Sequence, residues 1–418
     1  MSGQTAVGHP RRLTQADVDV ICVKHDRLFS SRPGGARAVF SWCDLSGLDL
    51  TGRNLSDADF TGAILAGCRM IGTRLDNALL FGADLQNADL TNVSLRRADL
   101  RGACLRGADL TGSDLFEADL REGAIATADA EMGYRILEPT KRASDVQGAI
   151  LIGANLERSK LSGAIAVRAD FTDAIMKDAK LVRANLKQAN LNGANLSGAD
   201  LTGADLAGAD LRDAVLIGAM TQSCKLDGAL MDGALTDTPS GKDVSHLPFA
   251  QMLRDHALWC ESDGAQGQPS RFDEADLRSL GSISGYNLTA LSARGAVFYG
   301  LNMESVQLQG AHLEGADLRN CNLKRADLRG ARLTNAKLSG SNLGEAQLGP
   351  LVIGQDRLLP CDLRGAMVKN ADLRGADLRG ALMTGSNLSR SDFTGALLRE
   401  SDLLGAHAEG AKGLGSVR

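Results

Sequence analysis

Aromatic residues are scarce in this sequence, at 4% of 418 positions, and there are only 8 prolines. A conventional core built on aromatic side chains and a proline-rich linker protein are both excluded by that composition. Glycine is abundant, with 48 residues, but it follows no Gly-X-Y pattern, which excludes collagen.

Long apolar runs and paired cysteines are also missing. No window approaches the ~18 to 20 consecutive apolar residues of a membrane helix, and the amino-terminal segment lacks the apolar core of a signal peptide. The 8 cysteines occur singly, without any C-x-x-C pair, in a chain too long to need a disulfide framework. These absences predict a soluble chain without a membrane segment, located in the reducing cytoplasm.

Charge of either sign is nearly balanced. Lys and Arg number 46 and Asp and Glu 51, for a net charge of −5, so no direct binding of nucleic acid is expected. The six histidines show no metal-ligand spacing, and neither a phosphate-binding G-x-x-x-x-G-K-[ST] loop nor a strand-linked G-x-G-x-x-G is present. We therefore expect no enzyme, no catalytic residue, no metal and no cofactor.

What the sequence does contain is a period of five. Read as Ala-Asp/Asn-Leu-x-x, a large apolar centre recurs from Phe40 to Ile125, from Val146 to Thr236, and from Ile283 through Ile353 to Ala408. Neither the helical period of 3.6 nor the strand period of 2 stays in phase with it. A small residue two before each centre has the same period, which predicts a chain that turns a corner every five residues. Four sides then close a coil that stacks at the ~4.8 Å spacing of paired strands.

The centres are predicted to point inward and to form the core. Representative centres are Leu45, Phe60, Leu100, Phe171, Leu201, Leu318, Leu378 and Phe393. Five cysteines fall at the small position, and we expect them to be free thiols packed in the interior. They are Cys43, Cys68, Cys224, Cys321 and Cys361.

Repeats such as A-D-L-T-G at 199–203 and A-N-L-S-G at 194–198 resemble those of the pentapeptide-repeat family. The resemblance implies an all-β fold, a right-handed quadrilateral β-helix. Handedness and cross-section come from the resemblance alone. The periodicity by itself indicates a chain that turns every five residues and stacks as coils.

Breaks in the repeat suggest the domain organisation. We expect a tail and capping helix at 1–37, a first β-helix at 38–236 with a loop insertion at 126–145, and a linker with a second capping helix at 237–276. A second β-helix at 277–413 and a tail at 414–418 follow. Both helices have an apolar face, which in the first comprises Val18, Ile21, Cys22, His25, Leu28 and Phe29. His25 and His256 hold matching places, so two separate towers are expected, each with its own helical cap over an exposed edge.

Function is predicted less sharply than fold. The favoured hypothesis is a non-catalytic scaffold for protein–protein interaction in a bacterial cytoplasm, with an unidentified protein partner. Quinolone-resistance and gyrase-binding members of the family imply an alternative, a DNA mimic that modulates DNA gyrase or topoisomerase IV, but no repeat segment has the acidic excess of a mimic. Candidate interaction residues in the loop are Tyr134, Arg135, Lys141 and Arg142. Homodimerisation through the carboxy end, which lacks a cap helix, stays open.

Overall fold

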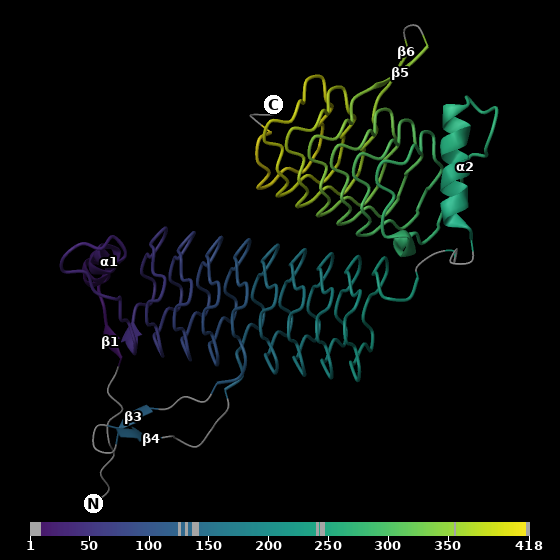
Figure 1. Cartoon of the computed structure of the whole chain (residues 1–418). Coiled ribbons are helices and arrows are strands. Elements are labelled where there is room, and N and C mark those ends of the chain that lie inside the picture. The colour runs from purple at the N-terminus through teal and green to yellow at the C-terminus, as the bar shows by residue number, and fades with distance from the viewer. Residues whose placement is uncertain are drawn as a thin grey trace, which may run out of the picture. The chain divides into compact units, whose positions relative to one another are not determined.

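The computed structural model describes residues 10–123, 127–129, 133–135, 142–239, 242, 247–354 and 357–414. The chain divides into two compact units, Met1–Thr238 and Pro239–Arg418, and each is a stack of coils (Figure 1). The labelled elements are β1 (Arg11–Arg12), α1 (Gln15–Phe29), β2 (Cys43–Asp44), β3 (Thr127–Asp129), β4 (Gly133–Arg135), α2 (Phe249–Glu261), the 3-10 helix η1 (Arg278–Leu280), β5 (Leu351–Ile353) and β6 (Arg357–Leu359).

The coils are joined by parallel bridges that follow one regular spacing, such as Asp59 with Leu79 and Leu79 with Asp99. The N–H of each centre donates to a carbonyl of the next coil, as Leu201 does to Met220 at 2.8 Å. A turn follows every centre, and its corner residue often has a positive φ, 67° at Gly203 and 57° at Asp213. Glycine, Asn and Asp tolerate that conformation best, which explains why they recur at the corner. The fold is a β-helix.

The interior is lined by the centres and by the small residues between them. The representative centres are all 0% exposed: Leu45, Phe60, Leu100, Phe171, Leu201, Leu318, Leu378 and Phe393. Each buried centre contributes about 1.5 to 3 kcal/mol, as an upper estimate. Since every coil contacts mainly its two neighbours, stability accumulates coil by coil.

Three of the five cysteines at the small position hydrogen-bond to the coil before them. The thiols of Cys68, Cys224 and Cys321 donate to the carbonyls of Leu45, Leu201 and Phe298, at 2.9, 2.8 and 3.1 Å. Burial raises the pKa of Cys68 to about 11 and that of Cys321 to about 12. These thiols therefore stay protonated, and act as weak buried donors.

The first interruption leaves the wall after Glu122. Cys104 pairs with Asp145, which is 21 residues, one coil plus one, later than the regular spacing requires, and that spacing then resumes from Asp145 to Ile165. The inserted segment is thus 123–143, and it contains the antiparallel pair β3 and β4. The expected boundaries of 126–145 were wrong at both ends, because the insertion already begins at Gly123, which pairs with Arg142, and because Ser144 and Asp145 belong to the wall. Ile125, counted as a centre, lies outside the described residues.

A second interruption was missed by the sequence analysis. Arg332 pairs with Asp362 and Gln347 with Asp377, so both bridges span two repeats more than the regular coil does. The additional residues form the antiparallel hairpin of β5 and β6, which projects from the wall (Figure 1). Ile353, predicted as an inward centre, lies in β5 and is only half-buried. The hairpin was missed because the insertion is two whole repeats long, so the five-residue phase is the same before and after it.

The second unit also begins earlier than expected. Arg271 already pairs with Ser292, and Phe272 is 3% exposed, so the first coil starts inside the segment that was assigned to the linker and helix. The bridge from Asp276 to Val297 is one position longer than the regular bridge from Ser282 to Asn302. The one-position shift is absorbed at η1.

Both helices are held to the first coil of their unit by a buried histidine. His25 Nδ1 accepts the N–H of Ala38 at 3.0 Å, and its Nε2 lies 3.0 Å from the carbonyl of Ser56. His256 repeats this geometry with Ser270 and Thr289, at 2.9 and 3.0 Å.

The apolar face expected for α1 is only partly buried. Val18 and Cys22 are buried, but Leu28 and Phe29 are 45% and 47% exposed, because they stand at the carboxy end of the helix. Of the helices in the described ranges, none combines the length and apolar character that crossing a membrane requires.

Candidate interaction surfaces

The outer walls carry charge mostly as paired side chains. In an Asp-Leu-Arg repeat, Arg379 donates from Nε and Nη2 to the two carboxylate oxygens of Asp377, at 2.9 and 2.6 Å. The same carboxylate accepts the backbone N–H of Arg379 at 3.1 Å. These bonds hold the pKa of Asp377 below its usual range. We call this Asp–Arg pair, in which the arginine binds both carboxylate oxygens of the aspartate two positions before it, a fork. Similar forks occur at Asp99–Arg101, Asp119–Arg121, Asp210–Arg212, Asp276–Arg278, Asp317–Arg319, Asp327–Arg329, Asp362–Arg364 and Asp372–Arg374.

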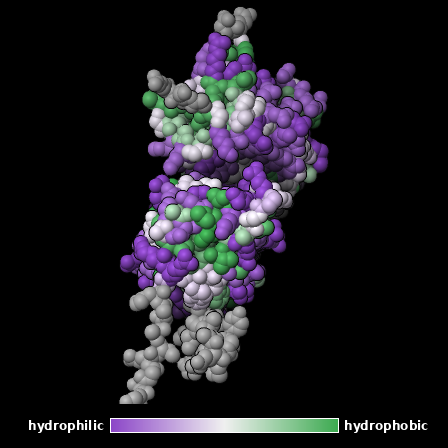
Figure 2. All heavy atoms as spheres, turned by 90° about the vertical axis from the view of Figure 1, so that its left-hand side faces the viewer, coloured by the Kyte–Doolittle hydropathy of each residue, from purple (hydrophilic) through white to green (hydrophobic). Residues whose placement is uncertain are grey.

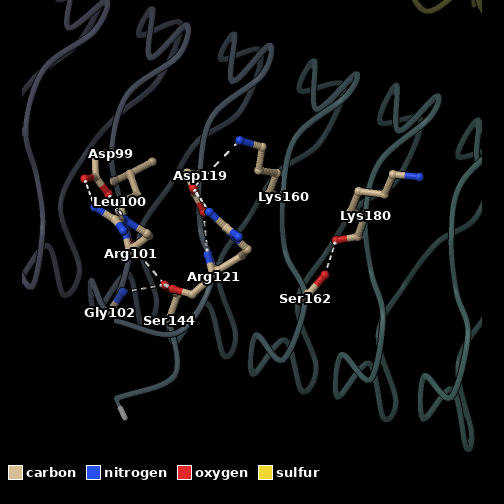
Figure 3. A network of polar contacts seen from close by, with 10 residues as sticks. All are labelled: Asp99, Leu100, Arg101, Gly102, Asp119, Arg121, Ser144, Lys160, Ser162 and Lys180. Carbon is tan, nitrogen blue, oxygen red and sulfur yellow. Dashed lines mark hydrogen bonds and ion pairs between the residues drawn. The ribbon is translucent and has the colours of Figure 1, made fainter. Parts of the chain in front are cut away.

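One wall of the first unit carries a row of basic residues on successive coils (Figure 3). Arg121 and Lys160 both approach Asp119, with closest distances of 2.7 and 4.0 Å, and Lys180 follows on the next coil. The row is broken by carboxylates at every fork. It therefore presents mixed charge and not a continuous polyelectrolyte surface.

The root of the first insertion is fastened to the wall by Ser144 (Figure 3). Its hydroxyl accepts the N–H of Gly102 at 2.9 Å and lies 3.0 and 2.9 Å from the carbonyls of Leu100 and Arg121. Gly123 and Arg142 exchange two backbone hydrogen bonds of 2.9 Å. The chain thus leaves and rejoins the wall at one place.

The candidate residues of the first insertion are only partly described. Tyr134 and Arg135 belong to β4 and pair with Ala128 and Thr127 of β3. Lys141 lies outside the described residues. Arg142 is exposed at the root. The backbone therefore places Tyr134 and Arg135 in one strand and Arg142 at the base of the same insertion.

The β5/β6 hairpin has one packed and one exposed face. Leu351 and Leu359 are cross-strand partners at its root, and a Cβ added to Gly330 would lie 2.7 Å from the Cβ of Leu351. Val352 and Leu358, the next pair, are 66% and 60% exposed. These two apolar side chains oppose each other directly across the hairpin and together form an exposed apolar pair on a projecting element.

Apolar side chains also gather at the α1 end of the first unit, where Figure 2 shows a hydrophobic area among hydrophilic surroundings. Exposed apolar residues of that region include Val20, Val23 and Phe29 of α1 and Trp42 of the first coil. This area comprises more residues than the hairpin pair, and it lies on α1 and the first coil and not on a projecting hairpin.

A signal for the β5/β6 hairpin was present in the sequence. Pro350 takes the place of the corner residue after Leu348, where φ is commonly positive. The pyrrolidine ring locks the φ of proline at a negative value. A proline at a corner therefore marks an interruption even where the phase of the repeat is unbroken.

Coils of five-residue repeats with projecting hairpins define a solenoid repeat protein. The chain matches the model of the family "Pentapeptide repeats" in eight copies, and the matched residues are 38–77, 78–115, 142–178, 179–218, 307–344, 361–400 and 377–412. They make up more than half of the chain, so the protein belongs to the pentapeptide-repeat family. No curated protein matches the chain.

Several solved structures are similar. The pentapeptide repeat protein Rfr23 from the cyanobacterium Cyanothece 51142 is 30% identical, over 31% of this chain and 91% of that protein, with a TM-score of 0.24. HetL from Nostoc sp. strain PCC 7120, involved in heterocyst differentiation regulation, is 26% identical over 80% and 91%, with a TM-score of 0.18. QnrB1, a plasmid-mediated fluoroquinolone resistance protein, is 17% identical over 55% and 93%, with a TM-score of 0.19. Scores this low carry no argument about function.

Proposed function

We propose that the protein is a non-catalytic scaffold that holds a protein partner by the hairpins projecting from its coils. The observation that carries this proposal is the exposed pair Val352 and Leu358, which sits on a hairpin whose root is packed against the wall. A rigid stack of coils supplies a fixed platform for such an element, and the described side chains include no group of three or more metal-ligating residues.

The alternative, mimicry of duplex DNA toward a type II topoisomerase, has less support. A mimic must reproduce the charge density of a phosphate backbone. Carboxylates in this chain are repeatedly neutralised by the arginine two positions on, as in Asp210–Arg212 and Asp362–Arg364. The walls offer paired charge where a mimic needs unpaired negative charge.

The proposal includes the architecture expected from the sequence. We propose two right-handed quadrilateral towers, with α1 and α2 as the caps over their first coils. The histidine contacts support this, since each joins a helix to the backbone of a first coil. We also propose a reducing compartment such as the cytoplasm, because the eight cysteines are free thiols.

Homodimerisation through the last coil is a further part of the proposal. Leu397 and Leu404 are 50% and 75% exposed there, and Leu398 and Leu403, at inward positions, are only half-buried. We expect sedimentation to show a concentration-dependent dimer that Leu404→Lys abolishes, with Leu230→Lys at the end of the first unit as the control. A monomer at every concentration would contradict this part.

The scaffold proposal is tested by removing the hairpin without disturbing the coil. Replacing residues 350–360 by one glycine removes two repeats' length and restores the regular coil spacing between Gln347 and Asp377, so we expect thermal unfolding to stay nearly unchanged. Affinity capture from the native extract should recover partner proteins with the intact chain and lose them, at least about tenfold, with the shortened one. A second variant, Val352→Ser/Leu358→Ser, keeps the hairpin backbone and should give the same loss, which would assign the loss to the apolar pair. Equal recovery by all three chains would refute the proposal.

A further inference from the structure

Two glycines in the second unit have no conformational explanation, and one of them, Gly349, has no steric explanation either. Gly344 and Gly349 directly follow the centres Leu343 and Leu348, a position where most other repeats carry a residue with a side chain, often Arg, Lys, Ser or Thr. Neither has a positive φ. A Cβ on Gly349 would make only ordinary contacts, 3.6 Å from the carbonyl oxygen of Arg379 and 3.8 Å from the carboxylate of Asp377.

Other glycines with an ordinary φ are explained by crowding. A Cβ on Gly35 would lie 2.4 Å from the backbone nitrogen of Leu28, and one on Gly123 would lie 2.8 Å from the ring of Phe81. Gly349 meets no such obstacle. The absence of a side chain at Gly349 leaves empty space on the wall.

The coil that contains Gly349 lacks the Asp–Arg fork that both neighbouring coils have on this wall. Gln347 pairs with Asp327 on one side and Asp377 on the other, and both aspartates begin an Asp-Leu-Arg fork. In the coil between them, Gln347-Leu348-Gly349 supplies neither the carboxylate nor the guanidinium. A hollow of about 530 Å³ lies on that wall, beside Pro350 at the root of the β5/β6 hairpin.

The groups around the hollow are donors that lack an acceptor. In the neighbouring coils, the carboxylates of Asp327 and Asp377 accept the N–H two positions on, at 3.2 and 3.1 Å. The N–H of Gly349 has no partner among the described residues. Arg329 and Arg379 use Nε and Nη2 in their forks, and within the same ranges their Nη1 atoms make no hydrogen bond.

Acidic groups at the hollow do not fill this role. Asp377 is engaged by Arg379, and Glu400 lies 3.2 Å from Arg399, which also lines the hollow. Each of the three guanidiniums at the hollow has one carboxylate partner, Asp327 for Arg329, Asp377 for Arg379 and Glu400 for Arg399, so the local charge is balanced and no carboxylate is left over for the Gly349 N–H. A carboxylate brought from outside would complete the pattern of the wall.

We propose that this hollow binds a carboxylate of a peptide segment of the partner, either an Asp or Glu side chain or a carboxy-terminal group. The inference rests on the proposed function and names the chemistry of the partner at the hairpin. The carboxylate takes the place that Asp327 and Asp377 hold in the adjacent coils, with the N–H of Gly349 and the free Nη1 atoms as its donors. Apolar residues next to it contact Val352 and Leu358.

The test fills the hollow with the fork of its neighbours. Gln347→Asp/Gly349→Arg rebuilds Asp-Leu-Arg in that coil, and we expect it to fold with an unchanged or higher Tm, because a Cβ has room and φ is ordinary. The matched control is Asn342→Asp/Gly344→Arg, which builds the same fork on the adjacent wall. That wall has a smaller hollow, of about 340 Å³, between Lys324 and Arg374.

Binding is measured by anisotropy with peptides that carry an uncharged fluorophore. The probes are blocked Ala-Leu-Glu-Leu-Ala, its Gln and phosphoserine counterparts, and Ala-Leu-Leu with a free or an amidated carboxy terminus. We expect the Glu peptide or the free-terminus peptide to bind at least about tenfold more tightly than its uncharged counterpart, and the arm that does so identifies the source of the carboxylate. The 347/349 variant should lose that preference, and the 342/344 variant should keep it.

Several outcomes overturn the inference: no measurable binding, equal affinity for charged and uncharged peptides, tighter binding of phosphoserine than of Glu, or an unfolded 347/349 variant. The proposed function is separable from it. If the hairpin replacement abolishes capture of the partner while the 347/349 variant retains it, the scaffold stands and the carboxylate site falls.

Discussion

Replacing Leu201 by Asp is expected to unfold the coils around it. Leu201 is 0% exposed, and its N–H donates to Met220 of the next coil. The substitution removes a buried centre worth about 1.5 to 3 kcal/mol and places an unpaired carboxylate inside the stack. The combined loss is on the order of 5 kcal/mol, comparable to the whole stability of a typical domain. The thermal transition should move down by more than ten degrees, on the order expected for such a loss.

Local resolution comes from hydrogen exchange. Since coils stabilise their neighbours, amide protection should fall most in the coils that contain Leu181 and Leu201 and least near the α1 end. Thr202→Asp is the control, because Thr202 is next in sequence but lies on the outside of the wall, where its N–H is bonded to Asp200 at 3.2 Å. Equal unfolding of the two variants would contradict the inward assignment of the centres.

The inward centres were accessible to sequence reasoning because the period is enforced physically. Every fifth side chain must enter the same crowded interior, so Leu201 or Phe171 cannot be polar without a large penalty. Corners are equally legible, since residues such as Gly203 and Asp213 are selected for a positive φ. Because burial of the centre and positive φ at the corner constrain every repeat, both can be recognised in the sequence of every repeat.

The hairpin at 351–359 could not be seen by the same logic. Its insertion is two whole repeats long and preserves the phase, and its apolar residues Ile353 and Leu358 fall where centres are expected. The hollow at Gly349 was hidden for a different reason. Glycine is so frequent at corners that its meaning one position earlier emerges only when φ and the surrounding atoms are known.

Acidification from pH 7.5 to 5 is expected to release the helices before the coils unfold. Burial is the main cause that lowers the pKa of both His25 and His256 from 6.5. Nδ1 of His256 accepts the N–H of Ser270, so Nε2 must carry the proton that bonds the carbonyl of Thr289. Protonation would set a second N–H against that of Ser270 and break the contact.

The sign follows from proton linkage. The pKa of each histidine is lower in the folded than in the unfolded state, so the unfolded state binds more protons as the pH falls. The stability that the neutral histidines give is therefore fully present above about pH 6.5 and is lost as the pH falls toward the folded pKa. Hydrogen bonds from Arg374 and Arg379 lower the pKa of Asp372 and of Asp377, so these two carboxylates stay ionised throughout the window. A change between pH 7.5 and 5 therefore reports the histidines and not general acid unfolding.

Far-UV dichroism at 222 nm separates the two events, since α1 and α2 are the only α-helices in the described ranges. Wild type should lose part of this signal reversibly below about pH 6.5. His25→Phe/His256→Phe should lack the pH dependence. At pH 7.5 it should also be destabilised, since each substitution leaves a buried N–H and a carbonyl unpaired, at about 1 to 3 kcal/mol apiece. His407→Gln, at an exposed position on the last coil, should behave as wild type. A 222 nm signal that stays constant to pH 5 in wild type would show that the histidines do not hold the helices in place. In that case the two matching sets of contacts would serve packing alone.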